Sequence, residues 1–363
     1  MIYFFKSFIF FVYSIFFKRK VDIVFYYPQH FNRDESSQNM YFNHLYKCCK
    51  EEKKSYLIFE EPDRFSIIGR NNKTIPFDFI YYLIIFLRKF IKSDQHIGKL
   101  LRKSFFSKIY FDNVIILSQS MIEVFRGINF DSNIFDLQHG IIFSNQASYL
   151  ENNCVSKHIK KNKIKILLFG YAFKSILDTS DSSKYYINNS HVIGVNRDSA
   201  KLLHSRFNNN ILVSLQFTDD HSYSQNKILL DELQKLILRY SNFNFYLRNH
   251  PRASTDFDIN FLFKLNNVFK SNESLFKSFK LCSVHITAYS TTTFEAAYFG
   301  IPTFFLTSLN DDFNMFHNDF NYVLKNEIKN IVNNYVQSSL KVQKWEALFY
   351  STFNRDKFLS LLK

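Results

Sequence analysis

Short runs of apolar, β-branched and aromatic residues alternate with helical stretches along the chain, and this alternation constrains the fold more than any other feature. A run at 21–27 is followed by a polar loop and a helical stretch at 37–49, and the next run lies at 55–59. The same alternation restarts at 210–215. Strands that alternate with helices pair in parallel, with helices on both faces of the sheet. The sequence therefore predicts an α/β protein with two successive parallel sheets.

The length of 363 residues is also typical of two domains rather than one core. We expect a first domain at 21–205, a second domain at 206–340 and a closing C-terminal helix at 341–363. The polar stretch 198–210 is the best candidate for the linker. The sequence shows no Pro/Gly/Ser-rich tether, so we expect the two domains to pack closely.

The first seventeen residues are nearly all apolar and are followed by Lys18, Arg19 and Lys20. A secretory signal has its charge before the apolar run, and a spanning helix needs about 20 apolar residues. On a helix, this segment has a broad aromatic face and a thin polar stripe, which is typical of helices that lie in the membrane interface. We expect residues 1–20 to form such an amphipathic helix. A first helix buried against the protein is the alternative, and a spanning helix ranks third.

The formal net charge of +14 favours anionic partners, which are nucleic acid, anionic lipid or phosphorylated substrates. The sequence has no zinc-finger, RNA-binding or basic-zipper pattern, so we expect no nucleic-acid partner. The four cysteines have neither zinc-site nor disulfide spacing and are expected to be reduced thiols.

One chemistry-bearing segment is 286–302, where a strand leads into a hydroxyl-rich turn and then a helix. Ser290, Thr291 and Thr292 lie where a helix N-terminus exposes unpaired N–H groups, which attract anions. Glu295 lies in the first helical turn, where it can accept a hydrogen bond from a ribose hydroxyl. The alternative is an ordinary Ser/Thr helix cap with an acidic first turn.

A second segment is 246–252, where a strand delivers His250 and Pro251 at its C-terminal end. Ligands of parallel sheets bind at that edge. An imidazole there can donate to a phosphate, and Arg248 can add positive charge. Gln216 follows another strand of the same domain and is a further candidate to bind the phosphate-bearing ligand. A loop histidine without a ligand is the alternative.

A third segment, Asp136–Gly140, also follows a strand. We expect Gln138 and His139 to face the cleft between the domains and Gly140 to permit a close turn. The alternative is a buried, hydrogen-bonded pair that holds a loop. His139 is a candidate catalytic base, and Asp34 and Glu35 are others, with a solvated turn as the alternative for the carboxylates.

Together, the three segments resemble GT-B glycosyltransferases of bacterial surface polysaccharide synthesis. Gln138-His139-Gly140 is similar to an element of capsule, O-antigen and Kdo-type transferases. His250-Pro251 and Ser290-Thr291-Thr292 resemble the His-Pro and Ser-Ser/Thr pair of GT-B sialyltransferases. Glu295-Ala296 with Gly300-Ile301-Pro302 resembles the broader donor signature of the fold. The acidic-acidic-glycine base motif of the sialyltransferases is lacking.

The resemblance implies two Rossmann-like domains that face a central cleft, with the nucleotide in the second. Ser290 and Thr291 would hold phosphate, His250 would reach the same anion, and Glu295 would read the ribose or base. No metal and no cofactor besides the nucleotide-sugar substrate are implied, and CMP is the favoured nucleotide.

The implied acceptor is a lipid-linked or lipopolysaccharide-bound glycan at the cytoplasmic face of the inner membrane, where the protein is peripheral. Alternatives are a polyol-phosphate transferase of the teichoic-acid type, a nucleotide-sugar epimerase of the same fold, and a non-catalytic polysaccharide-assembly protein.

Overall fold

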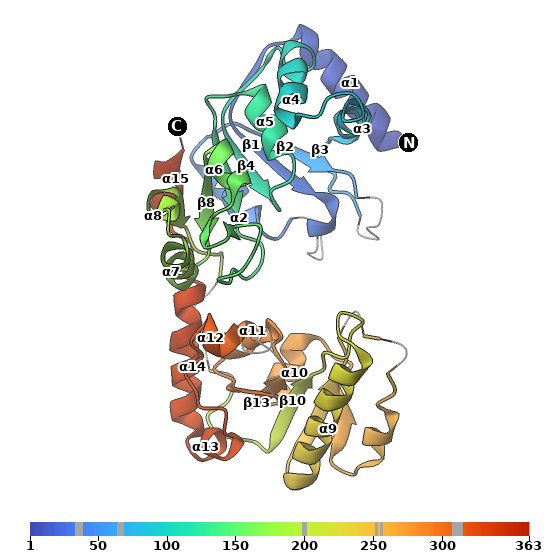
Figure 1. The fold of residues 1–363 in the computed structure, drawn as a ribbon, viewed down its shortest axis with the longest axis vertical. Coiled ribbons are helices and arrows are strands. Elements are labelled where there is room, and N and C mark those ends of the chain that lie inside the picture. The colour runs from blue at the N-terminus through green and yellow to red at the C-terminus, as the bar shows by residue number, and fades with distance from the viewer. Residues whose placement is uncertain are drawn as a thin grey trace. The chain divides into compact units, whose positions relative to one another are not determined.

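The computed structural model of the chain, shown in Figure 1, describes residues 1–32, 39–63, 69–197, 202–250, 253–254, 257–306 and 315–362. It divides into two compact units. Unit 1 comprises Met1–Asn196 together with Ser351–Lys363, and unit 2 comprises Arg197–Tyr350. The change from unit 1 to unit 2 therefore comes before the expected boundary at 205–206.

Unit 1 is built on a parallel sheet with the strand order β3-β2-β1-β4-β5-β8-β9. Most residues of the central strands are buried, which explains why they read as continuous apolar runs rather than alternating patterns. The strands are β1 (Arg19–Pro28), β2 (Tyr56–Glu61), β3 (Ile75–Pro76), β4 (Ile109–Leu117), β5 (Asn133–Leu137), β8 (Ile164–Leu168) and β9 (Ser190–Val192).

Short helices cover this sheet, and Figure 1 shows α1, α3, α4 and α5 grouped together. A separate hairpin pairs β6 (Leu150–Glu151) with β7 (Cys154–Val155). The helices are α1 (Ile2–Phe16), η1 (Gln29–Phe31), α2 (Asn43–Glu51), α3 (Asp78–Leu87), α4 (Asp94–Lys103), α5 (Ile122–Ile128), α6 (Lys157–Asn162), α7 (Tyr171–Ser180), α8 (Tyr185–Asn189) and α15 (Arg355–Leu361).

Helix α1 has one covered face and one open face. Ser7, Phe11 and Ser14 are buried, and the hydroxyl of Ser7 accepts the backbone N–H of Phe79 at the start of α3 at 3.1 Å. The opposite face leaves large apolar side chains more than half exposed, namely Ile2, Phe5, Ile9, Tyr13 and Phe16. Packing against the protein and an open aromatic face thus occur on the same helix. No helix among the described residues is long and apolar enough to cross a bilayer.

A buried cluster of charges fastens α1 and α3 to the sheet. The Arg70 guanidinium pairs with Glu60 at 3.0 Å and with Asp78 at 2.9 Å, and it lies 5.1 Å from the ring centre of Tyr3 on α1. Buried charges need such paired and hydrogen-bonded surroundings, because an unpaired one is strongly destabilising. This cluster ties Arg70 to the end of β2 and to the start of α3.

The chain returns to unit 1 after α14. The Ser351 N–H donates to the Phe169 carbonyl at 2.9 Å, and Thr352 forms a parallel bridge with Val195. Gly194 has a φ of +79°, and a Cβ there would lie 2.3 Å from the Thr352 carbonyl oxygen. Figure 1 shows α15 among the helices of unit 1. The closing helix expected at 341–363 is therefore two helices in different units.

Unit 2 contains a parallel sheet with the order β12-β11-β10-β13-β14, which is the 3-2-1-4-5 order of a Rossmann-like fold. Its strands are β10 (Asn210–Ser214), β11 (Asn244–Arg248), β12 (Val268–Lys270), β13 (Val284–Thr287) and β14 (Thr303–Phe305). The two parallel sheets confirm the predicted α/β class.

The helices of unit 2 pack around this sheet, and α11 and α14 share an aromatic core in which Phe294 stacks on Trp345 at 5.0 Å. These helices are α9 (Tyr223–Arg239), η2 (Asn260–Lys264), α10 (Leu275–Leu281), α11 (Thr292–Tyr298), α12 (Met315–Asn318), α13 (Ile328–Asn333) and α14 (Tyr335–Phe349). The glycine at 300, with a φ of +70°, ends the α11 region and leads into β14.

Helices α4 and α5 approach closely through two glycines. A Cβ at Gly127 would lie 2.2 Å from the Gln95 carbonyl oxygen and 2.8 Å from the Cα of Gly98. We expect Gly127→Ala to lower the free energy of unfolding by about 1–3 kcal/mol, because the helices must separate to admit a methyl group. Urea denaturation measures the change. Gly140→Ala is the matched control, since a Cβ there meets nothing within 4 Å. Equal stabilities would contradict the close packing.

Candidate functional site

Three strands of unit 2 end side by side, which gathers the loops that carry the predicted donor residues. Ser214 at the end of β10 lies opposite Arg248 of β11 and opposite Thr287 of β13. Adjacent strands are about 4.8 Å apart, so the ends of β11 and β13 are separated by about 10 Å. The segment that begins at Arg248 and the segment that leads to Ser290 therefore leave the same edge of the sheet.

Gln216 joins two of these loops. Its Oε1 accepts the Thr287 hydroxyl at 2.9 Å and the backbone N–H of Tyr289 at 2.7 Å. The side chain thus ties the loop after β10 to the turn before α11. In this arrangement Gln216 shapes the turn, whereas the sequence predicts that it binds the donor.

A buried imidazole supports the same turn. His285 on β13 is completely buried, and its Nε2 lies 2.8 Å from the Ser214 hydroxyl while its Nδ1 lies 3.0 Å from the Thr303 hydroxyl. Thr292 Oγ1 is 3.3 Å from the same Nε2 and 2.9 Å from the Ser290 hydroxyl. Burial lowers the pKa of His285 to about 3, so the ring is neutral. This network fixes Ser290 and Thr292 at the edge.

Sequence reasoning did not identify His285. The sequence does contain a signal for it, since a histidine inside an otherwise apolar strand needs buried hydrogen-bond partners. Its partners come from β10 and β14, and their pairing with β13 was not visible in the sequence.

In the turn before α11, the side chain of Thr291 is exposed to solvent. It makes no side-chain cap bond, whereas the Thr292 N–H donates to the Ser290 hydroxyl at 3.3 Å. The Ser/Thr cap that the sequence allows as an alternative is therefore supplied by Ser290 and not by Thr291.

Glu295 lies on α11 and is accessible to solvent, but protein surrounds it closely. This partial removal of water raises the pKa of its carboxyl above the usual value. Nearby on α14, burial raises the pKa of Glu346 to about 7, while its ion pair with Arg197 opposes the shift. The charge of Glu295 also raises the pKa of Glu346. A carboxylate that is accessible but crowded by protein is suited to accept a hydrogen bond from a ligand hydroxyl.

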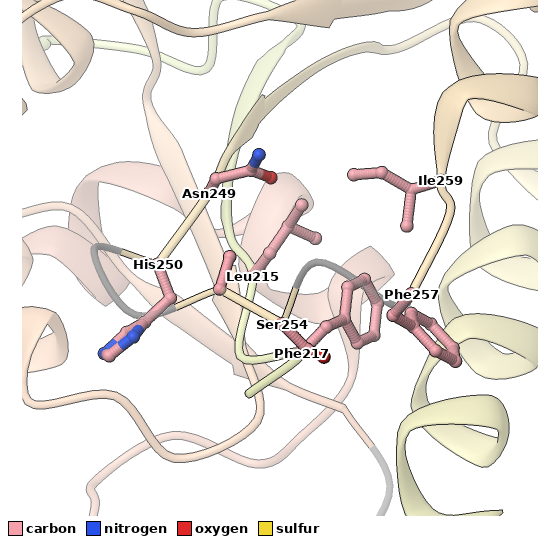
Figure 2. A pocket seen from close by; sticks show the side chains of 8 residues that line it. Leu215, Phe217, Asn249, His250, Ser254, Phe257 and Ile259 are labelled. Carbon is pink, nitrogen blue, oxygen red and sulfur yellow. The ribbon is translucent and has the colours of Figure 1, made fainter. Parts of the chain in front are cut away.

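A small pocket opens between the loops after β10 and β11 (Figure 2). Its volume is about 40 Å³, far below the roughly 300–1,000 Å³ of typical small-molecule pockets. Phe217 and Phe257, with ring centres 5.0 Å apart, form part of its apolar wall. The lining residues are Leu215, Phe217, Asn249, His250, Ala253, Ser254, Phe257 and Ile259. It can hold one apolar edge of a ligand and cannot enclose a nucleotide.

His250 is half-buried at the rim of this pocket, and its carbonyl accepts the Ala253 N–H at 3.0 Å. Arg248 donates from its guanidinium to the Glu273 carbonyl. Pro251 lies outside the described residues. The structure thus places His250 at the predicted edge and gives Arg248 a contact with the loop before α10.

In unit 1, Gln138 is completely buried and holds its own loop. It accepts the Phe169 N–H at 2.9 Å and donates to the Gly140 carbonyl at 2.8 Å. The alternative, a buried hydrogen-bonded pair that holds a loop, is thus met by Gln138 but not by His139, which is only half-buried. Gly140 does not have a left-handed φ and has open space where a Cβ would lie, so other residues would also fit at this turn.

His139 is half-buried, with its ring edge-on to Phe31 at 5.3 Å. It therefore lies near the end of β1 and remains a candidate at this edge. Asp34 and Glu35 lie outside the described residues.

Further acidic groups occur at the same edge of unit 1. Glu61 at the end of β2 accepts a hydrogen bond from the Tyr26 hydroxyl at 2.6 Å and from the Ser120 hydroxyl at 2.8 Å, and burial raises its pKa.

The backbone on either side of Ser120 is unusual. Gln119 has a φ of 58° and Met121 a φ of 57°, which is an uncommon backbone conformation for such residues. Locally strained backbone of this kind is frequent in functional loops.

A histidine–carboxylate pair also lies there. The Nδ1 atom of His30 is 2.7 Å from Oδ2 of Asp63, with the His30 side chain 38% exposed and that of Asp63 22% exposed. Neither residue is among the candidates from the sequence. The missed signal is that each follows a strand by two residues, in the same position as the residues chosen elsewhere.

The described residues contain no group of three His, Cys, Asp or Glu side chains that could hold a metal. The sequence has one Asp-x-Asp tripeptide at 256–258, of which Asp256 lies outside the described residues. Metal independence stays a prediction.

Comparison with known proteins identifies the fold. The chain matches no protein-family model and no curated protein. Among solved structures it is similar to the wall teichoic acid polymerase TagF, with a TM-score of 0.52 and 12% identity over 99% of this chain and 92% of that chain. It is similar to the UDP-GlcNAc 2-epimerase from Neisseria meningitidis, bound to UDP-GlcNAc, with a TM-score of 0.51 and 12% identity over 94% and 99%.

A third similar structure is the glycotransferase of kitacinnamycin, with a TM-score of 0.50 and 9% identity over 95% of this chain and 98% of that chain. At such low identity the similarity shows the fold alone. The chain therefore has the predicted GT-B fold with two Rossmann-like units, and the comparisons do not single out the sialyltransferase-like group. One fold that carries different activities leaves the activity to be argued from the site.

Asp136 provides a pH test of the unit 1 edge. It is completely buried, accepts Gln119 Nε2 at 3.0 Å and the Tyr149 hydroxyl at 3.2 Å, and burial raises its pKa to about 7. Its ordinary pKa is about 3.9. Because the folded protein holds this proton more tightly than the unfolded chain, the carboxyl stabilises the fold most at a pH below about 3.9. This contribution to the free energy of unfolding falls as the pH rises and is lost once the pH passes about 7.

Asparagine stays neutral at every pH. We therefore expect the free energy of unfolding of Asp136→Asn, relative to that of the wild type, to rise by about 2–3 kcal/mol from pH 5 to pH 8. Urea denaturation at both pH values measures the difference. Parallel pH profiles of the two proteins would show that the carboxyl is not buried as described.

Proposed function

We propose that this protein is a glycosyltransferase that moves a sugar from a nucleotide-sugar donor to a lipid-linked or lipopolysaccharide-bound glycan in bacterial surface polysaccharide synthesis. One observation carries the proposal. The segments containing His250, Ser290 and Glu295 leave one edge of a sheet that has Rossmann-like strand order. The GT-B fold supports it as the scaffold of known transferases.

The chemistry proposed for unit 2 is binding and leaving-group stabilisation. His250 donates to a phosphate of the donor, and the hydroxyls of Ser290, Thr291 and Thr292 hold the same anion. Glu295 accepts a hydrogen bond from the ribose. Donors aimed at the departing phosphate stabilise the charge that develops there, which is why we propose a metal-independent transfer. CMP is our preferred nucleotide.

The proposed location is the cytoplasmic face of the inner membrane, with peripheral attachment. The open face of α1 carries Phe5, Ile9 and Phe16, and three exposed cations follow the helix at 18–20. An amphipathic helix with an aromatic face and adjacent cations binds anionic lipid surfaces by burial and charge together. A glycan on a lipid carrier would then be presented to an enzyme already at the membrane.

The similarity to TagF favours a second candidate, a polyol-phosphate transferase of the teichoic-acid type. The similarity to UDP-GlcNAc 2-epimerases favours an enzyme that turns over its donor without an acceptor. Incubation with labelled sugars linked to CMP, CDP, UDP or GDP, with CDP-glycerol in parallel, separates these activities. A glycosyltransferase releases the nucleotide and leaves no donor phosphorus on the acceptor, and its transfer persists in a metal chelator.

The donor site is tested by nucleotide binding. In a thermal-shift panel with CMP, CDP, UDP and GDP, we expect one nucleotide to stabilise the wild type. His250→Ala and Glu295→Ala should each weaken that binding about 10–100-fold, because each removes a hydrogen bond to a charged or polar ligand group. Glu327→Ala, an exposed carboxylate in the same unit, is the control. Unchanged binding in both site variants would remove the assignment.

The membrane surface is tested by vesicle sedimentation. We expect the variant with Phe5, Ile9 and Phe16 all replaced by serine to bind vesicles of anionic phospholipid at least about 10-fold more weakly, because it loses most of the buried apolar area. Phe269→Ser is the control, since this phenylalanine is 40% exposed on β12 in unit 2. Equal binding of the triple variant and the wild type would place the contact elsewhere.

A further inference from the structure

The His30–Asp63 pair is created by the register of the first two strands. Pro28 of β1 lies opposite Glu61 of β2, and each member of the pair follows its strand by two residues. The two side chains therefore meet just beyond the carboxyl edge of the unit 1 sheet, where ligands of parallel sheets bind. The Nδ1–Oδ2 distance of 2.7 Å is that of a strong, charge-assisted hydrogen bond.

The geometry of the pair orients the imidazole. Because Nδ1 engages the carboxylate, Nε2 on the opposite side of the ring is directed away from Asp63. The His30 side chain is 38% exposed, so the ring is accessible, while its partner is more covered at 22%. A carboxylate at one nitrogen fixes the tautomer and stabilises the ring when the other nitrogen takes up a proton.

The surroundings hold the pair in place. The backbone N–H of Asp63 donates to Gln29 Oε1 at 3.3 Å, which anchors Asp63 to the segment after β1. The His30 ring packs on Phe31 with ring centres 4.4 Å apart, and Phe31 is itself buried. His139 meets Phe31 at 5.3 Å, so both histidines share this aromatic side chain. A base built this way is oriented before a substrate arrives.

Two other half-buried histidines of unit 1 are less suited to take up a proton. Burial lowers the pKa of His44 to about 4, and burial with nearby lysines lowers the pKa of His191 to about 4. Both rings are therefore poor bases at neutral pH. His158 on α6 is also 38% exposed and lies near a carboxylate, but its Nδ1 atom is 3.7 Å from Oε1 of Glu123. His30 combines the same exposure with a carboxylate oxygen at 2.7 Å, within hydrogen-bond distance, just beyond the carboxyl edge of the sheet.

We propose that His30 is the general base of the transfer and that Asp63 is its positioning residue. This inference rests on the proposed glycosyltransferase function and adds an inverting mechanism. The acceptor oxygen forms a bond to the anomeric carbon of the sugar, and the bond from that carbon to the phosphate oxygen breaks. The electron pair leaves with the nucleotide phosphate. The acceptor proton passes to Nε2 of His30, and the Asp63 carboxylate stabilises the resulting imidazolium.

The test compares transfer with donor binding in the full-length protein. Radiolabelled sugars linked to CMP, CDP, UDP or GDP are the donors, and detergent-solubilised lipopolysaccharide is the acceptor. We expect His30→Gln to lower kcat by about 10²–10⁴-fold. The KM for the donor and the thermal shift by its nucleotide should be unchanged. His96→Gln, an exposed histidine on α4, is the matched control and should keep full activity.

Rescue separates a chemical role from a structural one. We expect added imidazole to restore part of the transfer by His30→Ala, since the free base occupies the vacated space. We expect Asp63→Asn to lower kcat without changing nucleotide binding and Asp63→Glu to retain more activity than Asp63→Asn. A merely structural pair would show neither imidazole rescue nor the order of the two Asp63 variants.

Two failures remain distinguishable. Transfer by the wild type together with a His30→Gln rate within about twofold of it would overturn the base assignment and leave the proposed function standing. An absence of both nucleotide binding and transfer in the wild type would overturn the proposed function and, with it, the role of His30. Retention of the anomeric configuration in the product would also overturn the base assignment.

Discussion

In both units, an inner strand pairs in parallel with a neighbour on each side, and this pairing determines at which edge of the sheet polar side chains can reach a ligand. β1 lies between β2 and β4, and β10 lies between β11 and β13. These central strands are buried along most of their length, so ligand-facing groups have to come from the loops at one edge. The strand ends are in register, and the loops that leave them start as neighbours.

The loops at these edges are held by buried polar side chains that do not themselves face a ligand. Gln138 performs this role in unit 1, and Gln216 and His285 perform it in unit 2. A buried amide or imidazole has to satisfy its hydrogen-bonding groups, and the partners nearest to a strand end are the backbone and hydroxyl groups of the next loop. Side chains left at the surface of the turn before α11, such as Thr291, are thereby offered on a fixed backbone.

Comparison of the sequence with the structure shows which residues could be assigned in advance. The positions of His250 and Ser290 at one edge follow from local patterns, since each comes shortly after a predicted strand, and Glu295 lies in the helix predicted to follow Ser290. The direction of Gln138 did not follow, because a side chain after a strand has the same sequence signature whether it turns inward or outward. His30 was passed over because its partner Asp63 is 33 residues away and is brought near by strand register.

By itself, the sequence determined the α/β class, the two successive parallel sheets and the edge at which chemistry is concentrated, because strand and helix periodicity depends on neighbouring residues. Only the tertiary structure decided the return of the C-terminal segment to unit 1, the covered face of α1 and the pairing of His30 with Asp63. These features depend on contacts between residues distant in the chain. Such contacts are selected by the packing of the whole unit rather than by local pattern.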